Sequence, residues 1–191
     1  MNHILVEMMS ELTHLTEEEK SGIENSFPVK ELDKGTYLLK EGQIAQNAYF
    51  VINGCIREYE LMNGEEKTIE FYTEHQSAAN FNSLANKIPS KRYFICNEKT
   101  TVAILSSEKE KELYIKHPRF EAFCRTGMEK MFGEKQNQLA EYISLKPKER
   151  YLKLQKLRPD LINRVPQYQI ASYLGIKPET LSRIRKRFIK S

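Results

Sequence analysis

Apolar residues recur at helical spacing in two short segments near the C-terminal end of the chain, and a glycine separates the segments. The apolar positions are Ile170, Ala171 and Leu174, followed by Leu181, Ile184 and Phe188. Gly175 suits the end of the first helix, because glycine adopts a left-handed turn without a Cβ clash. Pro178 suits the first position of the second helix, where no N–H partner is needed. The pattern predicts a helix-turn-helix with an apolar inner face and a basic outer face.

Short β-prone segments fill the middle of the chain, with turn signals between them. The segments span residues 36–39, 48–52, 56–62, 68–72, 93–96 and 100–105. Asn53-Gly54 and Asn63-Gly64 are strong hairpin signals, since both residue types tolerate positive φ. Several short strands at close spacing predict a compact antiparallel barrel or jelly roll. Residues 75–91 interrupt the strand pattern with a short helical stretch, which either closes a ligand pocket or caps the roll.

Helical periodicity predicts α-helices on both sides of the strand-rich region. One helical region covers 3–26, with Thr16 as an N-cap, and a helix of about 39 Å covers 120–145. One small domain rarely covers the apolar stripe of so long a helix, so a second subunit is expected to cover it. Gly127 and Gly133 each cost roughly 1 kcal/mol in a helix interior, which favours close approach of backbones or a bend. The expected dimer-contact residues are Phe123, Gly127, Met131, Phe132 and Leu139.

The predicted fold class is α+β, with three consecutive regions. They are a sensor domain at 1–117, a dimerisation helix at 118–146, and a helix-turn-helix domain at 147–191 that lacks a β-hairpin wing. Residues 146–191 hold 13 Lys/Arg against 3 Asp/Glu, a net of +10, whereas 1–145 hold 17 against 23, a net of −6. This division predicts a polyanionic partner for the C-terminal region alone.

Cysteine count and hydropathy exclude several classes of protein. Cys55, Cys96 and Cys124 are odd in number and widely spaced, so they predict neither a disulfide framework nor a CxxC metal site. No apolar run reaches the length of a membrane span, and the N-terminus lacks the basic start and cleavage site of a signal peptide. We therefore expect a soluble, cytoplasmic protein without a cofactor or a metal.

Sensor roll, long helix and helix-turn-helix together resemble the CRP/FNR family of bacterial transcription regulators. The resemblance covers nearly the whole chain and rests on three motifs: Leu32-x-Lys34-Gly35-x5-Glu41-Gly42, Ala48-Tyr-Phe-Val-Ile-x-Gly54, and Ile170-Ala-x-x-Leu-Gly-x-x-x-Glu-Thr-Leu-Ser-Arg183. The first two are similar to the opening of a cyclic-nucleotide-binding-type roll, and the third is similar to the family's DNA-reading segment. The resemblance implies a homodimeric regulator and not an enzyme, with double-stranded DNA as partner and RNA polymerase as a candidate partner.

The second helix of the helix-turn-helix carries the residues that the resemblance assigns to base reading. In the family a Glu and an Arg, four residues apart, face base edges, and Glu179 and Arg183 match them. The alternative role of this pair is a surface ion pair at i,i+4. Pro178 replaces an Arg that is frequent in the family, which removes one base contact. The residues expected to flank the groove are Tyr168, Thr180, Ser182, Lys186 and Arg187.

The sensor region departs from the family's cyclic-nucleotide signature. The family implies a Glu on the ribose and an Arg on the cyclic phosphate, but Phe81 and Ile95 stand at the matching positions. A buried anion without its cation is costly, so we expect no binding of cyclic AMP or cyclic GMP; Arg92 is the nearby substitute. The family's haem branch needs an axial ligand, for which His75 is the candidate, and its oxygen-sensing branch needs cysteines before Cys55. The candidate pocket, for an unknown effector, comprises Phe81, Asn82, Ser83, Arg92, Ile95 and Cys96.

Two other interpretations stay open on the sequence alone. One keeps the fold but makes the protein a dimeric scaffold, which binds another protein through its basic region and does not bind DNA. The other is a cupin-type barrel enzyme, which needs two or three clustered His and a Glu around a metal. The enzyme interpretation is disfavoured because no two histidines are close in sequence. They are His3, His14, His75 and His117.

Overall fold

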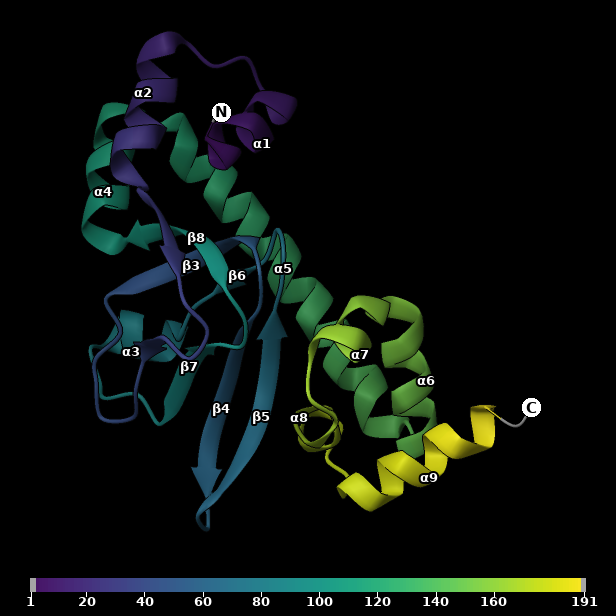
Figure 1. The fold of residues 1–191 in the computed structure, drawn as a ribbon. Helices are drawn as coiled ribbons and strands as arrows, with labels where there is room; N and C mark the ends of the chain where they lie inside the picture. Colours follow the sequence, from purple (N-terminus) through teal and green to yellow (C-terminus); the bar gives the residue numbers. More distant parts are fainter. Residues whose placement is uncertain (1–2, 190–191) are drawn as a thin grey trace. The chain divides into compact units, whose positions relative to one another are not determined.

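The computed structural model describes residues 3–189, with side chains described through Lys186 in the last helix (Figure 1). The chain divides into two compact units. Unit 1 comprises Met1–Glu58 and Phe71–Thr126, and unit 2 comprises Tyr59–Glu70 and Gly127–Ser191. The boundary therefore falls inside a β-hairpin as well as inside the long helix.

Two four-stranded sheets make the β-roll. One sheet has the order β1-β8-β3-β6, with the bounds Val29–Leu32, Thr100–Ser106, Asn47–Asn53 and Ser77–Ala78. The other has the order β2-β7-β4-β5, with the bounds Tyr37–Leu39, Arg92–Cys96, Ile56–Met62 and Glu65–Tyr72. Strand β8 pairs antiparallel with both β1 and β3, and β2 pairs antiparallel with β7. This arrangement confirms the predicted jelly-roll-like β-roll and leaves it as two sheets that do not close into a barrel.

Apolar side chains from both sheets form the core of the roll. Val51 on β3 lies opposite Val102 on β8, and both side chains are fully buried. Burial of a Val, Leu, Ile or Phe side chain contributes roughly 1.5–3 kcal/mol, so this core fixes the strands that carry the candidate ligand site. The other buried members of the cluster are Leu39, Ala45, Ile56, Ala78 and Phe94.

Helices that precede and follow the roll in sequence pack together in unit 1. They are α1 (Ile4–Leu12), α2 (Glu17–Ser26), α4 (Ser107–Lys116) and the first residues of α5 (Arg119–Ser144). The helical region predicted over 3–26 is two helices, because Thr16 begins α2 with a capping box to Glu19. Arg119 Nε donates to Glu19 Oε1 at 2.6 Å, which ties the start of α5 to α2.

Unit 2 contains the C-terminal part of α5 and four further helices. These are α6 (Pro147–Leu157), α7 (Pro159–Arg164), α8 (Gln167–Tyr173) and α9 (Pro178–Ile189). A proline begins α6, α7 and α9, a position that suits its fixed φ and missing N–H. Over residues 3–189 no strand follows β8. The buried apolar residues of these helices and their connections are Tyr151, Leu154, Leu161, Val165, Ile170, Ala171, Leu174 and Leu181.

Candidate functional site

Helices α8 and α9 are joined by a tight turn (Figure 1). Gly175 adopts a φ of 67°, a left-handed conformation that glycine takes without strain. The N–H of Ile176 donates to Ala171 O at 3.0 Å, and the N–H of Gly175 donates to Ser172 O at 3.0 Å. These two bonds form a Schellman motif that satisfies carbonyls at the end of α8. The turn therefore directs the chain into α9 as the sequence predicts.

The two helices share a buried apolar face. Ile170, Ala171 and Leu174 on α8, and Leu181 on α9, are at most 1% exposed. On the other side of α9, the side chains of three charged residues are exposed to solvent. They are Glu179, Arg183 and Lys186. Helix α9 therefore presents a carboxylate and two cations away from the core of unit 2.

Contacts of the outward-facing residues are few and local. Arg183 Nη2 donates to Thr180 Oγ1 at 3.3 Å, and within residues 3–189 Arg183 forms no ion pair with Glu179. Tyr168 on α8 is 57% exposed. Ser182 is half-buried. The side chain of Arg187, also predicted to contact DNA, lies outside the described residues. The Arg183 guanidinium and the Glu179 carboxylate are thus available to an external partner.

Inside unit 2, the middle of the β4–β5 hairpin bonds to α8. Ser172 Oγ donates to Glu66 O at 3.1 Å and accepts from the Thr68 N–H at 2.9 Å. Tyr173 OH donates to Glu70 Oε1 at 3.1 Å. Burial and the neighbouring Glu70 carboxylate raise the pKa of Tyr173, so the phenol remains a neutral donor. These contacts hold α8, the first helix of the helix-turn-helix, against strand β5.

Helix α5 leaves most of its apolar side chains exposed. Phe120 is the one fully buried residue among the described side chains of this helix. Of the predicted contact residues, Phe123 and Met131 are half-buried and Gly127 is exposed. A Cβ added at Gly127 or Gly133 would meet no atom within 4 Å. The most exposed large apolar residues of the helix are Met128, Phe132, Leu139 and Ile143, at 42%, 64%, 62% and 72%.

The segment between β6 and β7 is held by polar side chains. Helix α3 (Phe81–Asn86) begins after Asn80, whose side chain accepts from the Ser83 N–H at 3.2 Å. Ser83 Oγ accepts from the Ala45 N–H at 2.8 Å and donates to Ile88 O at 2.6 Å. The buried Ser83 hydroxyl therefore links α3 to the loop that follows α3 and to the loop that follows β2.

The residues predicted to line an effector pocket are distributed over several surfaces. On α3, Phe81 is 44% exposed, Asn82 is exposed and Ser83 is buried. On β7, Arg92 lies on the core-facing side of the strand, and Ile95 lies on the opposite side because side chains alternate along a strand. Cys96 is buried next to this strand's end, where burial raises the pKa of its thiol.

A half-buried ion pair and a tyrosine hydrogen bond connect three neighbouring strands of the roll. The Glu58 side chain on β4 is 4% exposed and pairs with Arg92 on β7 at 2.5 Å. Tyr72 OH on β5 donates to the second oxygen of Glu58 at 2.6 Å. Glu58 was not among the residues predicted from the sequence, although one signal was present. Glu58 shares the core-facing side of β4 with Ile56 and thus breaks the apolar alternation of that strand.

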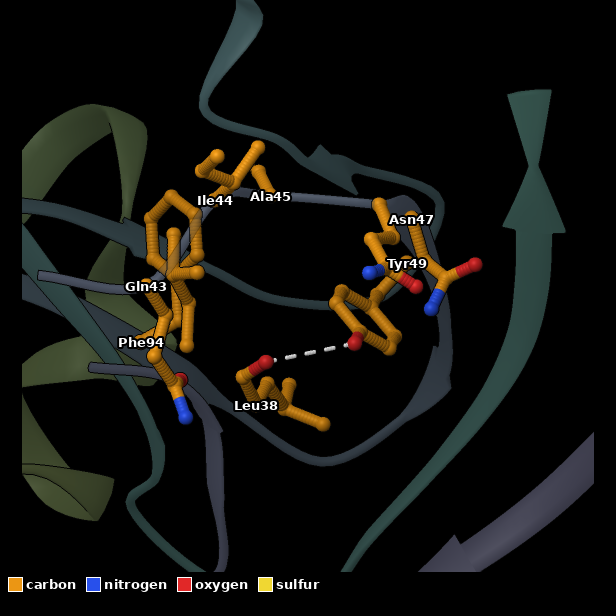
Figure 2. Close-up of a pocket in the computed structure, with 9 residues that line it drawn as sticks. Leu38, Gln43, Ile44, Ala45, Asn47, Tyr49 and Phe94 are labelled. Atoms are coloured by element: carbon orange, nitrogen blue, oxygen red, sulfur yellow. Dashed lines mark hydrogen bonds between the residues drawn. The ribbon is translucent and has the colours of Figure 1, made fainter. Parts of the chain in front are cut away.

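The roll also has a hollow of about 470 Å³ (Figure 2). Tyr49 OH donates to Leu38 O at 3.3 Å across this hollow, and burial raises the pKa of Tyr49. None of the six residues predicted to line an effector pocket lines this hollow, and its lining carries no charged side chain. The lining residues are Leu38, Leu39, Gln43, Ile44, Ala45, Gln46, Asn47, Tyr49 and Phe94.

Other candidate features of the sequence can also be placed in the described part of the chain. No three His, Cys, Asp or Glu side chains in it gather as a metal site requires. His75 is exposed, with its ring 6.4 Å from that of Phe50. No described helix is both long enough and apolar enough to cross a membrane. All three cysteines are free, with Cys55 and Cys96 buried and Cys124 exposed.

Comparison with known proteins identifies the roll and the fold. Residues 29–117 match the family model of the cyclic nucleotide-binding domain. CLP, a c-di-GMP responsive global regulator of Xanthomonas campestris, has a similar structure, with a TM-score of 0.68, 14% identity and 92% of each chain covered. A mutant of CooA from Carboxydothermus hydrogenoformans has a TM-score of 0.63 and 18% identity, with 88% of this chain and 79% of CooA covered. The chain has the CRP/FNR fold.

A third structure shares the CRP/FNR fold with this chain. A putative cAMP-binding regulatory protein from Silicibacter pomeroyi DSS-3 has a TM-score of 0.62 and 22% identity, with 92% of this chain and 82% of that chain covered. No curated protein sequence matches the chain. The glycines of the first two sequence motifs, Gly35, Gly42 and Gly54, all adopt positive φ, a conformation that glycine takes without a Cβ clash.

Proposed function

We propose that the protein is a homodimeric transcription regulator that binds specific DNA sequences through α9. The observation that carries the proposal is the division of α9 into two faces. On its apolar face Leu181 is buried in unit 2, and Glu179, Arg183 and Lys186 are exposed on the other face. A helix of this kind is suited to the major groove of DNA. The net charge of +10 over 146–191 supports a polyanionic partner, and with DNA as partner we expect action in the cytoplasm of a bacterial cell.

Base reading is assigned to two of the exposed residues. Arg183 can donate two hydrogen bonds to guanine O6 and N7, and Glu179 can accept one from cytosine N4. Both side chains are exposed on one helix face, and among the described side chains Arg183 bonds to Thr180 at 3.3 Å. Phosphate contacts position the protein without specifying sequence. We assign them to Tyr168, Thr180, Ser182, Lys186 and Arg187.

Dimerisation through α5 is the second part of the proposal. The helix exposes large apolar side chains that a single chain leaves in water, among them Phe132 and Leu139. A partner α5 across a two-fold axis would cover the same residues on both copies. The open space around Gly127 and Gly133 would then admit a partner backbone. A two-fold dimer also provides two copies of α9 for two half-sites.

The third part of the proposal is that the roll does not take cyclic AMP or cyclic GMP. Phe81 is directed to solvent and Ile95 lies on the side of β7 away from the core, so neither replaces the polar groups that such a ligand needs. Arg92, the nearby cation, is paired with Glu58. Isothermal titration should show no binding of cyclic AMP below about millimolar concentration. A micromolar dissociation constant would contradict this part of the proposal.

The central experiment measures DNA binding by the full-length protein. Genomic footprinting first supplies a cognate duplex, and a scrambled duplex of the same composition is the control. A regulator of this kind should bind the cognate duplex more tightly by roughly 10³-fold or more. Affinity for both duplexes should fall steeply with salt, since phosphate contacts release counterions. Absence of binding to either duplex at low salt would refute the assignment of the basic region to DNA.

The same titration separates the regulator from the dimeric scaffold. A scaffold would bind no duplex and would keep its oligomeric state, whereas a regulator binds DNA in a salt-dependent way. We propose no catalytic role; the cupin-type metal enzyme stays the alternative that the spacing of the four histidines in the sequence disfavours. RNA polymerase is the protein partner that transcription regulation implies.

A further inference from the structure

The inner face of the roll carries an acid and a base that face each other. Glu58 shares the core-facing side of β4 with Ile56, and Arg92 shares that of β7 with Phe94. Strands β4 and β7 are neighbours in one sheet. The Glu58 side chain is 4% exposed and the Arg92 side chain is 40% exposed. The carboxylate is therefore buried, while the guanidinium lies between the interior and solvent.

Both oxygens of the Glu58 carboxylate are engaged. Oε1 accepts from Arg92 Nη1 at 2.5 Å, and Oε2 accepts from Tyr72 OH at 2.6 Å. The ring of Tyr72 meets Phe94 edge-on, with a centroid distance of 6.1 Å. Bonds between charged partners are stronger than bonds between neutral ones. A charge-assisted bond to Arg92 therefore holds one oxygen of the carboxylate, and a bond from Tyr72 holds the other.

The position of Arg92 is fixed by its own backbone. Ser90 Oγ accepts from the Arg92 N–H at 2.9 Å and donates to Arg92 O at 2.9 Å. The same oxygen accepts from Asn80 Nδ2 at 2.8 Å, and the Ser90 N–H donates to Gln43 O at 2.8 Å. Ser90 is itself 3% exposed. The start of β7 is therefore joined to two loops, which fix the backbone from which the Arg92 side chain extends.

This arrangement bears on the charge of any ligand inside the roll. The ligand that names the family carries a phosphate anion, and an anion removed from water needs a cation as partner. To reach Arg92 Nη1 from inside the roll, an anion would have to displace the Glu58 carboxylate. That carboxylate would then be buried without its cation and beside a second negative charge, which is strongly unfavourable.

We propose that the Glu58 carboxylate is a built-in counter-ion, which occupies the place on Arg92 that the anionic group of a ligand would take. The roll therefore excludes acidic ligands. Removal of the Glu58 charge should expose a latent site for a small oxyanion such as phosphate. The inference deepens the proposed function, since it explains why the effector domain of a CRP/FNR-fold regulator would need no acidic effector. It depends on that function only in treating the roll as the effector domain.

Isothermal titration of inorganic phosphate and of cyclic AMP at constant ionic strength tests the proposal on four proteins. The wild type should show no saturable binding of either up to about 10 mM. Glu58→Gln keeps a similar shape and should bind inorganic phosphate at least about tenfold more tightly than the wild type, because a charge-assisted bond to Arg92 becomes available. Glu58→Gln/Arg92→Gln should lose this gain. Glu60→Gln, which removes the same charge from the same strand, should behave as the wild type.

Thermal unfolding gives a second readout that does not require a fully stable variant. Phosphate should raise the melting temperature of Glu58→Gln more than that of the double variant, since a ligand that binds the folded state stabilises it. Three results would overturn the proposal: equal phosphate affinity in the wild type and Glu58→Gln, a gain that persists without Arg92, or no effect of phosphate on Glu58→Gln in either assay. None of these assays contains DNA, so their failure and a failure of DNA binding are distinguishable.

Discussion

At the scale of single residues, α9 separates sequence recognition from general attraction to DNA. Arg183 has a planar fork that matches a guanine edge, whereas Lys186 carries a compact charge without directional preference. Arg183→Ala should therefore cost about 1–3 kcal/mol per half-site and reduce the preference for the cognate duplex. Lys186→Ala should weaken cognate and scrambled duplexes similarly, and should reduce the salt slope by about one unit per lost phosphate contact.

Binding titrations at several salt concentrations check this pair, with each variant serving as the control for the other. If Arg183→Ala lowers both affinities equally, Arg183 contacts a phosphate and does not read a base. If Lys186→Ala changes the cognate preference, the division of roles along α9 is wrong.

Two glycines that have the same sequence context should differ in their tolerance of a methyl group. Gly54 and Gly64 each follow an asparagine, and both have positive φ, of 108° and 80°. A Cβ at Gly54 would lie 2.6 Å from Thr100 Cα and 2.7 Å from Lys99 O, whereas a Cβ at Gly64 would meet nothing within 4 Å. Gly64→Ala should cost about 1–2 kcal/mol of backbone strain, and Gly54→Ala should cost roughly 1–3 kcal/mol more through the clash. Urea denaturation measures both, and equal losses would contradict the close approach of Gly54 to β8.

Residues whose role is local were predictable from the sequence, and residues whose partners are distant were not. Gly175 was assigned to its turn because left-handed φ is a property of glycine itself. Ser172 gave no such signal, since its partner Thr68 is 104 positions away in the chain. Glu58 gave only the weak signal of an acid at a core-facing strand position, because its role depends on Arg92 and Tyr72, which lie 34 and 14 positions away in the chain.

At the scale of elements, the unpartnered apolar side of α5 predicts a subunit contact. Phe132 is 64% exposed and Met131 is half-buried. Met131→Glu/Phe132→Glu should place charge in the contact and yield monomers, because unpaired charges are costly to bury. Gln136→Glu/Gln138→Glu adds the same charge to exposed polar positions of the helix and should leave the dimer intact. Sedimentation measures both, and a double Glu variant that still sediments as a dimer would place the contact elsewhere.

The types of the elements, helix or strand, could be predicted from periodicity, whereas some helix boundaries depended on N-cap residues. The roll, the long helix and the helix-turn-helix were each predicted, since strand and helix periods differ clearly. Within the helical region over 3–26, Thr16 was predicted as an N-cap, and it caps α2 through a capping box with Glu19. The same Glu19 bonds Arg119, a contact that spans 100 positions and that no local pattern indicates.

At the scale of the whole molecule, two-fold symmetry should impose a spacing on the DNA site. A dimer presents its two recognition helices about 34 Å apart, so the half-site centres should lie roughly 10 bp apart on one side of the duplex. Insertion of about 5 bp between the half-sites should rotate one of them to the opposite side, since a turn of DNA is about 10–10.5 bp. The affinity of the wild type should then fall to that for a single half-site. The monomeric Met131→Glu/Phe132→Glu variant should bind both spacings with the same weak affinity, because it never engages two half-sites. If the wild type tolerates the insertion while the variant remains monomeric and folded, each subunit binds DNA independently and the dimer does not read a palindrome.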